Sequence, residues 1–420
     1  MHFNAILTAV TRMISAFLFL GATVYLARLL GPEGQGQYAF AMTLAATITQ
    51  FANLGLHAGN TYLVAQDRAR LPALLANSVW ISLGLGGIAG SVTFALGQSL
   101  GWVDGSPLWL ALLGGALVAA RLFFSLGGSL LAGLGRVRAL NIAELLNYGS
   151  TMVLLIVVGS LGGDIFSLMV ATLAAWTGAS AVMFALLVQT TGLSLQPDKR
   201  VFLVGWTYAA KAYAMSLLGF LVLRTSVFLI ESFHGKGEVG QYSVASQMFD
   251  FLNLLPASLA LVLLPRLVQD AGSRWTMTLK SVGIIGGVMI IACLGAACFA
   301  APTLQLLFGD RYADATPILL AMLPAAFFCS LTTVASQYLA AAGYPQELFA
   351  IWGGAWVATV ALGSVFIRSS GGYGAAITLS LVYAAAFVLS LGLAYLTEQR
   401  RLAASRIESP SLVTPRRAAA

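Results

Sequence analysis

Six ionisable residues lie inside long apolar stretches of this 420-residue chain, where charge is unusual. They are Arg12, Arg121, Glu144, Lys211, Arg224 and Asp250. A charge at the centre of a membrane-spanning helix costs about 2.5–3.5 kcal/mol on insertion, so such residues normally face protein or a wet cavity. Four cations against two carboxylates favour an anionic ligand, because converging cations repel one another unless an anion joins them.

Arg12 and Lys211 are the first candidates for an anion-binding centre. Arg12 lies about two turns into the first expected helix, on a stripe with Thr8 and Ser15, and Lys211 lies at similar depth in the seventh. We expect the two side chains to face one another across a central cleft, where a pyrophosphate would join them. The alternative is that each extends to the lipid headgroups.

The other charged residues leave two interpretations open. Arg224 and Asp250 lie at similar depth in adjacent expected helices, so they either form a structural ion pair or contact a ligand. Arg121 and Glu144 belong either to a structural network or to the cavity.

The polar residues Asn53 and His57 also allow two interpretations. Polar contact between helices is one role, and contact with sugar hydroxyls is the other.

Catalytic and metal chemistry has little support in this sequence. Cys293, Cys298 and Cys329 all lie in apolar stretches and are expected to act as small hydrophobic residues. Only three histidines occur, and none is close to a cluster of possible ligands. We therefore expect no metal, no cofactor and no enzyme activity.

The composition requires a membrane protein. Of all residues 59% are hydrophobic and 9% are charged, too few charges to cover a soluble globule. Apolar stretches of helix-spanning length recur along the chain, which predicts an all-α polytopic membrane protein with twelve spans. The expected spans are 5–27, 38–63, 72–97, 107–133, 139–160, 164–190, 201–231, 239–266, 277–301, 314–341, 346–367 and 373–397.

Positive charge predicts the orientation of these spans. Short cytoplasmic loops carry an excess of Lys and Arg. Most of the 22 cations lie in even-numbered loops and the tail, at Arg68, Arg70, Arg136, Arg138, Lys199, Arg200, Arg266, Arg274, Lys280, Arg400, Arg401, Arg406, Arg416 and Arg417. Both termini are therefore expected in the cytoplasm. The net charge of +7 follows from this topology and does not indicate nucleic-acid binding.

The chain contains an internal duplication. A shift of 204 residues places Gly31, Gly36, Gln37, Tyr38 and Ala41 on Gly235, Gly240, Gln241, Tyr242 and Ala245. Six spans per copy make the repeats parallel, with a central cavity between two six-helix lobes. We predict lobes at 1–191 and 201–397, a cytoplasmic linker at 192–200 and a disordered basic tail at 398–420. The repeated glycines are interpreted as turn formers between helices.

The stretch ARLLGPEGQGQYAFAMTLAATITQFANLGL, residues 27–56, resembles the opening of bacterial polysaccharide biosynthesis proteins. These are oligosaccharide flippases of the multidrug/oligosaccharidyl-lipid/polysaccharide exporter superfamily. The resemblance implies a cation-lined cavity that binds a polyprenyl-pyrophosphate-linked oligosaccharide, in contact with membrane lipids and with a polysaccharide polymerase or other assembly proteins. It also implies location in the bacterial cytoplasmic membrane, delivery to its outer leaflet, and a role in surface polysaccharide assembly.

Two other functions are weighed against this flippase. A cation-coupled multidrug exporter of the same superfamily would be expected to keep acidic residues in its cavity, and here cations dominate the spans. A membrane glycan polymerase or ligase would need a long loop with a carboxylate pair beside a histidine, and the expected loops are short.

Overall fold

The computed structural model describes residues 2–102, 105–192, 195–254, 256–257, 263, 267 and 272–408. Across these residues the regular secondary structure is helical, which confirms the all-α expectation. The elements are α1 (His2–Asn53), α2 (Leu56–Gln66), η1 (Arg68–Arg70), α3 (Leu71–Ile81), η2 (Ser82–Gly86), α4 (Gly87–Ser99), α5 (Pro107–Gly133), α6 (Val137–Ser160), α7 (Ile165–Thr191), α8 (Lys199–His234), α9 (Lys236–Leu252), α11 (Arg274–Phe308), η3 (Asp310–Tyr312), α12 (Ala315–Ala341) and α13 (Gln346–Glu408).

Nine segments of the described chain are long and apolar enough to cross a membrane. Two of them, Val10–Asn53 with 44 residues and Gln346–Ala403 with 58, far exceed the roughly 20 residues that one crossing needs. Each is interrupted by a glycine with left-handed backbone, Gly31 (φ 68°) in α1 and Gly371 (φ 54°) in α13, and so has the length for two crossings. The expected twelve spans are compatible with this fold. The eighth begins as α9 and runs into residues that lie mostly outside the described set.

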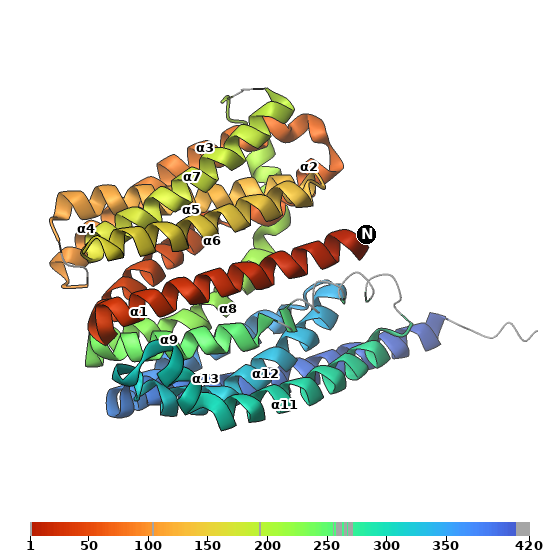
Figure 1. Ribbon diagram of the computed structural model, residues 1–420. Helices are drawn as coiled ribbons and strands as arrows, with labels where there is room; N and C mark the ends of the chain where they lie inside the picture. Colours follow the sequence, from red (N-terminus) through yellow and green to blue (C-terminus); the bar gives the residue numbers. More distant parts are fainter. Residues whose placement is uncertain are drawn as a thin grey trace, which may run out of the picture.

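The helices form two groups, which we call the N-terminal lobe (α1–α7) and the C-terminal lobe (α8–α13) (Figure 1). Within the first, α5 packs against α4 and α7; within the second, α12 packs against α11 and α13. Two helices connect the lobes, because α8 contacts both α2 and α13, and α9 packs along α1. One apolar cluster joins the C-terminal lobe to Ala27 and Phe40 of α1, and a second lies within the N-terminal lobe, so the two lobes pack together along α1.

The expected lobe boundaries need two corrections. The linker ends at Asp198, whose carboxylate accepts hydrogen bonds from the backbone N–H of Arg200 and Val201 (2.7 and 3.2 Å) and so starts α8 at Lys199. The expected disordered tail is wrong for residues 398–408, because α13 continues to Glu408. Glu398 is buried there, accepting hydrogen bonds from Tyr338 (2.7 Å) and Arg401 (2.8 and 2.9 Å), and residues 409–420 lie outside the described part.

The repeated glycines bring the two lobes into backbone contact at one end of the molecule. A Cβ atom on Gly36 would lie 1.7 Å from the carbonyl oxygen of Lys236, and one on Gly240 would lie 1.9 Å from that of Pro32. Positions 36 and 32 are the repeat counterparts of 240 and 236, so the contact is two-fold symmetric. We call this contact, made by Pro32, Gly36, Lys236 and Gly240, the seam.

The seam corrects one interpretation of the sequence. Gly31 and Gly235 do have positive φ and act as turn residues, as expected. Gly36 and Gly240 lie inside helices α1 and α9, so they are not turn formers. Because these two glycines have no side chain, the backbones of α1 and α9 can approach each other closely.

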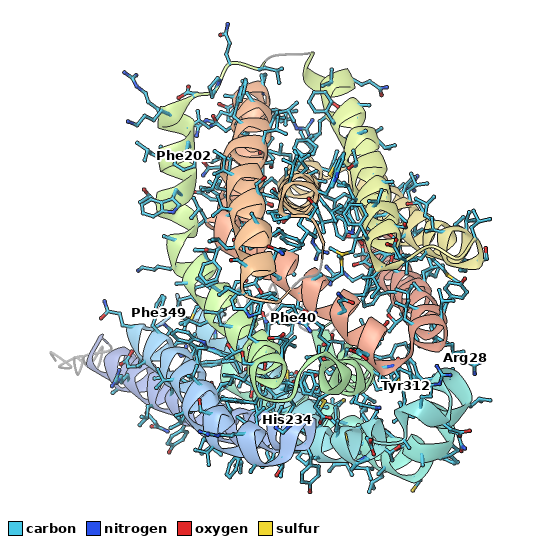
Figure 2. The ribbon with its side chains drawn as sticks, turned by 90° about the vertical axis from the view of Figure 1, so that its left-hand side faces the viewer. Arg28, Phe40, Phe202, His234, Tyr312 and Phe349 are labelled. Carbon is cyan, nitrogen blue, oxygen red and sulfur yellow. The ribbon has the colours of Figure 1, made fainter. Side chains whose placement is uncertain are left out.

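Hydrogen bonds between the lobes surround the seam. Arg28 donates to the carbonyl oxygens of Leu306 and Leu307 at the end of α11, the second at 2.7 Å. The Tyr312 hydroxyl donates to the carbonyl of Ala27 (3.1 Å). Figure 2 faces this end of the molecule and shows Arg28 and Tyr312 close together on it. The lobes are therefore closed against each other at the seam.

Candidate functional site

A cavity of about 380 Å³ lies between the lobes, close to the seam. Its wall comes from α1, α5, α6 and α7 on one side and from α8 and α9 on the other. Two cations and one carboxylate line it, Arg121 from α5, Arg224 from α8 and Asp250 from α9. Neutral polar side chains make up much of the remaining wall, including Thr23, Gln35, Tyr38, Thr43, Asn147, Tyr148, Thr151, Thr172, Tyr242, Ser243, Ser246 and Gln247. We call it the first cavity.

Arg121 is a cation that has no carboxylate partner among the described residues. Its guanidinium carbon lies 4.5 Å from the centre of the Trp176 ring, and Trp176 in turn packs edge-on against Phe124 (5.4 Å). This cation–π contact fixes the guanidinium but leaves its charge uncompensated. The Arg121 Nε is buried and has no hydrogen-bond partner in the part of the chain that the structure describes. An anion entering the first cavity would satisfy both the charge and this donor.

Arg224 is a cation with a partner. Its Nη2 lies 3.3 Å from Oδ2 of Asp250, which confirms the ion pair that the sequence left as one alternative. The two side chains keep 31% and 39% of their surface exposed, so the pair stands at the cavity wall and is not sealed in a core. A stronger anion can compete with Asp250 for Arg224 without unpacking either helix.

A second cavity of about 360 Å³ continues the first. The two share Phe19, Tyr148, Gln247 and Asp250. Along α1 the order is seam, then first-cavity residues Thr23 and Phe19, then second-cavity residues Ser15 and Arg12. The cavities therefore form a path that starts below the seam and runs toward the opposite end of the lobes.

The remaining sequence candidates fall into three places. Arg12 and Glu144 line the second cavity, so both meet the path. Lys211 is exposed on α8 and lines none of the cavities found in the described residues, so its pairing with Arg12 stays a prediction. Asn53 donates a hydrogen bond to Ser125 Oγ (3.2 Å), and its Oδ1 lies 2.8 Å from His57 Nδ1. Both contacts fit the first of the two expected roles, polar contact between helices.

Three residues that line the first cavity, Trp176, Asn147 and Gln35, were not predicted from the sequence. Trp176 was indistinguishable from other aromatic residues of an apolar helix. Asn147 and Gln35 are buried at 1% and 3% exposure and carry polar atoms without partners in the described chain. An asparagine in the middle of the expected span 139–160 was the available signal, since polar residues in a bilayer need a reason.

Solved structures show which architecture this is. The inward-facing conformation of a multidrug resistance MATE family transporter of the MOP superfamily aligns with a TM-score of 0.76 at 17% identity, covering 96% of this chain and 100% of the other. The lipid II flippase MurJ in an inward closed conformation aligns with a TM-score of 0.74 at 12% identity, covering 97% and 94%. A MOP superfamily transporter from Pyrococcus furiosus, described by its reversed binding-pocket polarity, gives 0.65 at 15% identity, covering 96% and 95%.

The fold is thus that of MOP superfamily transporters. The chain belongs to the family of polysaccharide biosynthesis proteins, whose family model matches residues 25–317. A search of curated protein sequences gave no match.

Proposed function

We propose that this protein is a flippase that moves a polyprenyl-pyrophosphate-linked oligosaccharide from the inner to the outer leaflet of the bacterial cytoplasmic membrane by alternating access, for surface polysaccharide assembly. One observation carries the proposal: Arg121 and Arg224, from opposite lobes, line one cavity inside the membrane-spanning helices, and Arg121 has no carboxylate partner in the described chain. Two guanidinium groups facing one cavity match the charge and the fork geometry of a pyrophosphate.

Size and wall chemistry support the same cargo. Each cavity lies within the volume range of ordinary ligand sites. The first cavity offers hydroxyl and amide groups beside its two arginines, a combination suited to a sugar attached to an anion. Movement of a lipid between leaflets makes and breaks no covalent bond, so a flippase acts as a transporter and not as an enzyme. Polysaccharide polymerases and other assembly proteins would act on the delivered lipid-linked product.

The proposed direction of transport rests on the orientation of the spans. With both termini in the cytoplasm, the seam lies at the outer face and the path from the first to the second cavity leads toward the cytoplasm. In this state the cargo would enter from the inner leaflet. We expect single cysteines at the exposed positions 136 and 311 to be labelled from the cytoplasmic and outer sides, respectively, in a background without native cysteines. Labelling of both from the same side would contradict this orientation.

The multidrug exporter is the second candidate function. It finds support in Glu144, which lines the second cavity near Asp250 and is the type of residue that attracts cationic drugs. Arg121 argues against it, because it has no carboxylate partner in the described chain and a cationic drug in the first cavity would meet a like charge.

A transport assay separates the two functions. The purified protein is placed in vesicles with a fluorescent polyprenyl-pyrophosphate-N-acetylglucosamine, and access of the label to a membrane-impermeant quencher is followed. In parallel vesicles, uptake of the cationic dye ethidium is measured. We expect protein-dependent movement of the pyrophosphate lipid and none of the dye. Ethidium transport without lipid movement would transfer the assignment to the exporter.

A further inference from the structure

Asn147 stands out on the wall of the first cavity because its side-chain amide has no hydrogen-bond partner among the described residues. It lies in α6, is 1% exposed, and lines the cavity. Both Nδ2 and Oδ1 lack a hydrogen-bond partner within the described residues. Its backbone carbonyl does accept hydrogen bonds, from the hydroxyls of Ser150 (3.2 Å) and Thr151 (2.7 Å). A buried amide is costly to leave unpaired, so it would gain from a donor and an acceptor that enter the cavity.

Two hydroxyls on the same wall, those of Tyr38 and Thr172, already have partners. The Tyr38 hydroxyl and Thr172 Oγ1 lie 2.7 Å apart, and Thr172 also donates to the carbonyl of Leu168 (3.0 Å). The buried groups on this wall that lack a hydrogen-bond partner within the described chain are the amide of Asn147, the Oε1 of Gln35 and the Nε of Arg121. All three belong to the N-terminal lobe and come from three different helices, α6, α1 and α5. Four of the ten buried side-chain atoms that lack a partner in the described chain belong to these three residues, and a ligand in the first cavity could pair with them.

We propose that Asn147 is the centre of a sugar subsite on the N-terminal lobe, next to Arg121 and Arg224. This subsite binds the first sugar of the cargo. The inference rests on the proposed function, since it takes the pyrophosphate to lie between Arg121 and Arg224. An asparagine amide offers one donor and one acceptor side by side. The complementary ligand group therefore also carries both, as an acetamido group or two adjacent hydroxyls of a sugar do.

With this subsite, different residues of the cavity bind different parts of the cargo. The arginines attract any polyprenyl pyrophosphate, with or without a sugar. Asn147 and Gln35 are satisfied only when a sugar follows the pyrophosphate. The protein then prefers loaded carrier lipid over the empty lipid, because the empty lipid leaves the buried amide unpaired.

Binding measurements on two defined lipids test the subsite. The probes are polyprenyl pyrophosphate and the same lipid carrying one N-acetylglucosamine, titrated into the full-length protein in nanodiscs. We expect the wild-type protein to bind the sugar-bearing lipid about tenfold more tightly, as one or two net hydrogen bonds would produce. Asn147→Leu should reduce this preference to within about twofold while keeping the affinity for the bare lipid.

Asn141 provides a matched control on the same helix. It is also buried, with an unpartnered Oδ1 in the described chain, but it lines neither cavity, so Asn141→Leu should keep the tenfold preference. Asn147→Ala, which adds no bulk, replaces the leucine variant if that variant unfolds. A preference retained in the Asn147 variants would mean that only water occupies the amide and would overturn the subsite. Equal binding of both lipids by the wild type would overturn the subsite but leave the flippase standing, and binding of neither would overturn both.

Discussion

Replacing Gly36 by alanine is expected to open the seam and to stop transport. The new Cβ would lie 1.7 Å from the Lys236 oxygen and 2.8 Å from the Gly240 nitrogen, both backbone atoms that no rotamer change can move. The lobes must therefore separate at this end. Overpacking costs about 1–3 kcal/mol where neighbours yield, which shifts a two-state population about 5- to 150-fold. Gly240→Ala should act the same way, because its Cβ meets the Pro32 oxygen at 1.9 Å.

Distances between spin labels across the seam measure this change. Labels at the exposed positions 33 and 232, one on each lobe, should move apart in Gly36→Ala compared with the parent. Gly237→Ala is the matched control in α9, since nothing lies within 4 Å of its added Cβ. An unchanged label distance together with normal transport in Gly36→Ala would show that the lobes do not need this contact.

Replacing Arg121 by glutamine is expected to abolish transport of the pyrophosphate lipid while leaving the protein folded. The change removes the charge that has no carboxylate partner in the described chain, and it leaves Asp250 as a repelling group in the same cavity. Loss of one charge-assisted contact should weaken lipid binding about ten- to hundredfold. Arg121→Lys should retain part of the activity, because an ammonium keeps the charge but lacks the planar fork that lies over Trp176.

Asp250 supplies a control of opposite sign. Asp250→Asn removes the competitor for Arg224, so it should tighten binding of polyprenyl pyrophosphate, whereas Arg224→Gln should weaken it. Titration of the same lipid into each variant in nanodiscs gives the comparison. Unchanged affinity in both Arg121→Gln and Arg224→Gln would place the anion elsewhere, with Arg12 and Lys211 the next positions to test.

The sequence was sufficient for the features that depend on length, charge and repetition. Apolar stretches predicted a helical membrane protein, and the 204-residue shift predicted two lobes around a cavity. Similar depth in adjacent helices predicted the Arg224–Asp250 contact, because a short turn leaves little freedom in their relative height.

Features that depend on the rotation of a helix about its axis could not be predicted in the same way. Arg12 and Lys211 were paired by similar depth, by equivalent helices in the two lobes and by the lack of an acidic partner, and none of these decides which side of α8 faces the cavity. The seam could not be predicted from the sequence for a related reason. A glycine in a sequence is equally compatible with a turn that needs backbone freedom and with the close approach of two helix backbones. The partner of Gly36 also lies 204 residues away, at Gly240.

The seam obeys two-fold symmetry, but the cavity beneath it does not. Arg224 and Asp250 correspond, 204 residues earlier, to Leu20 and Ala46, and Ala46 lines the same cavity opposite its charged counterpart. The seam therefore follows the two-fold symmetry of the repeats, whereas the charged residues in the cavity beneath it come from only one of the two equivalent positions. Under the proposed function, the pyrophosphate would lie between Arg121 and Arg224 and the first sugar at Asn147, so the cavity would hold the lipid-linked chain in one orientation.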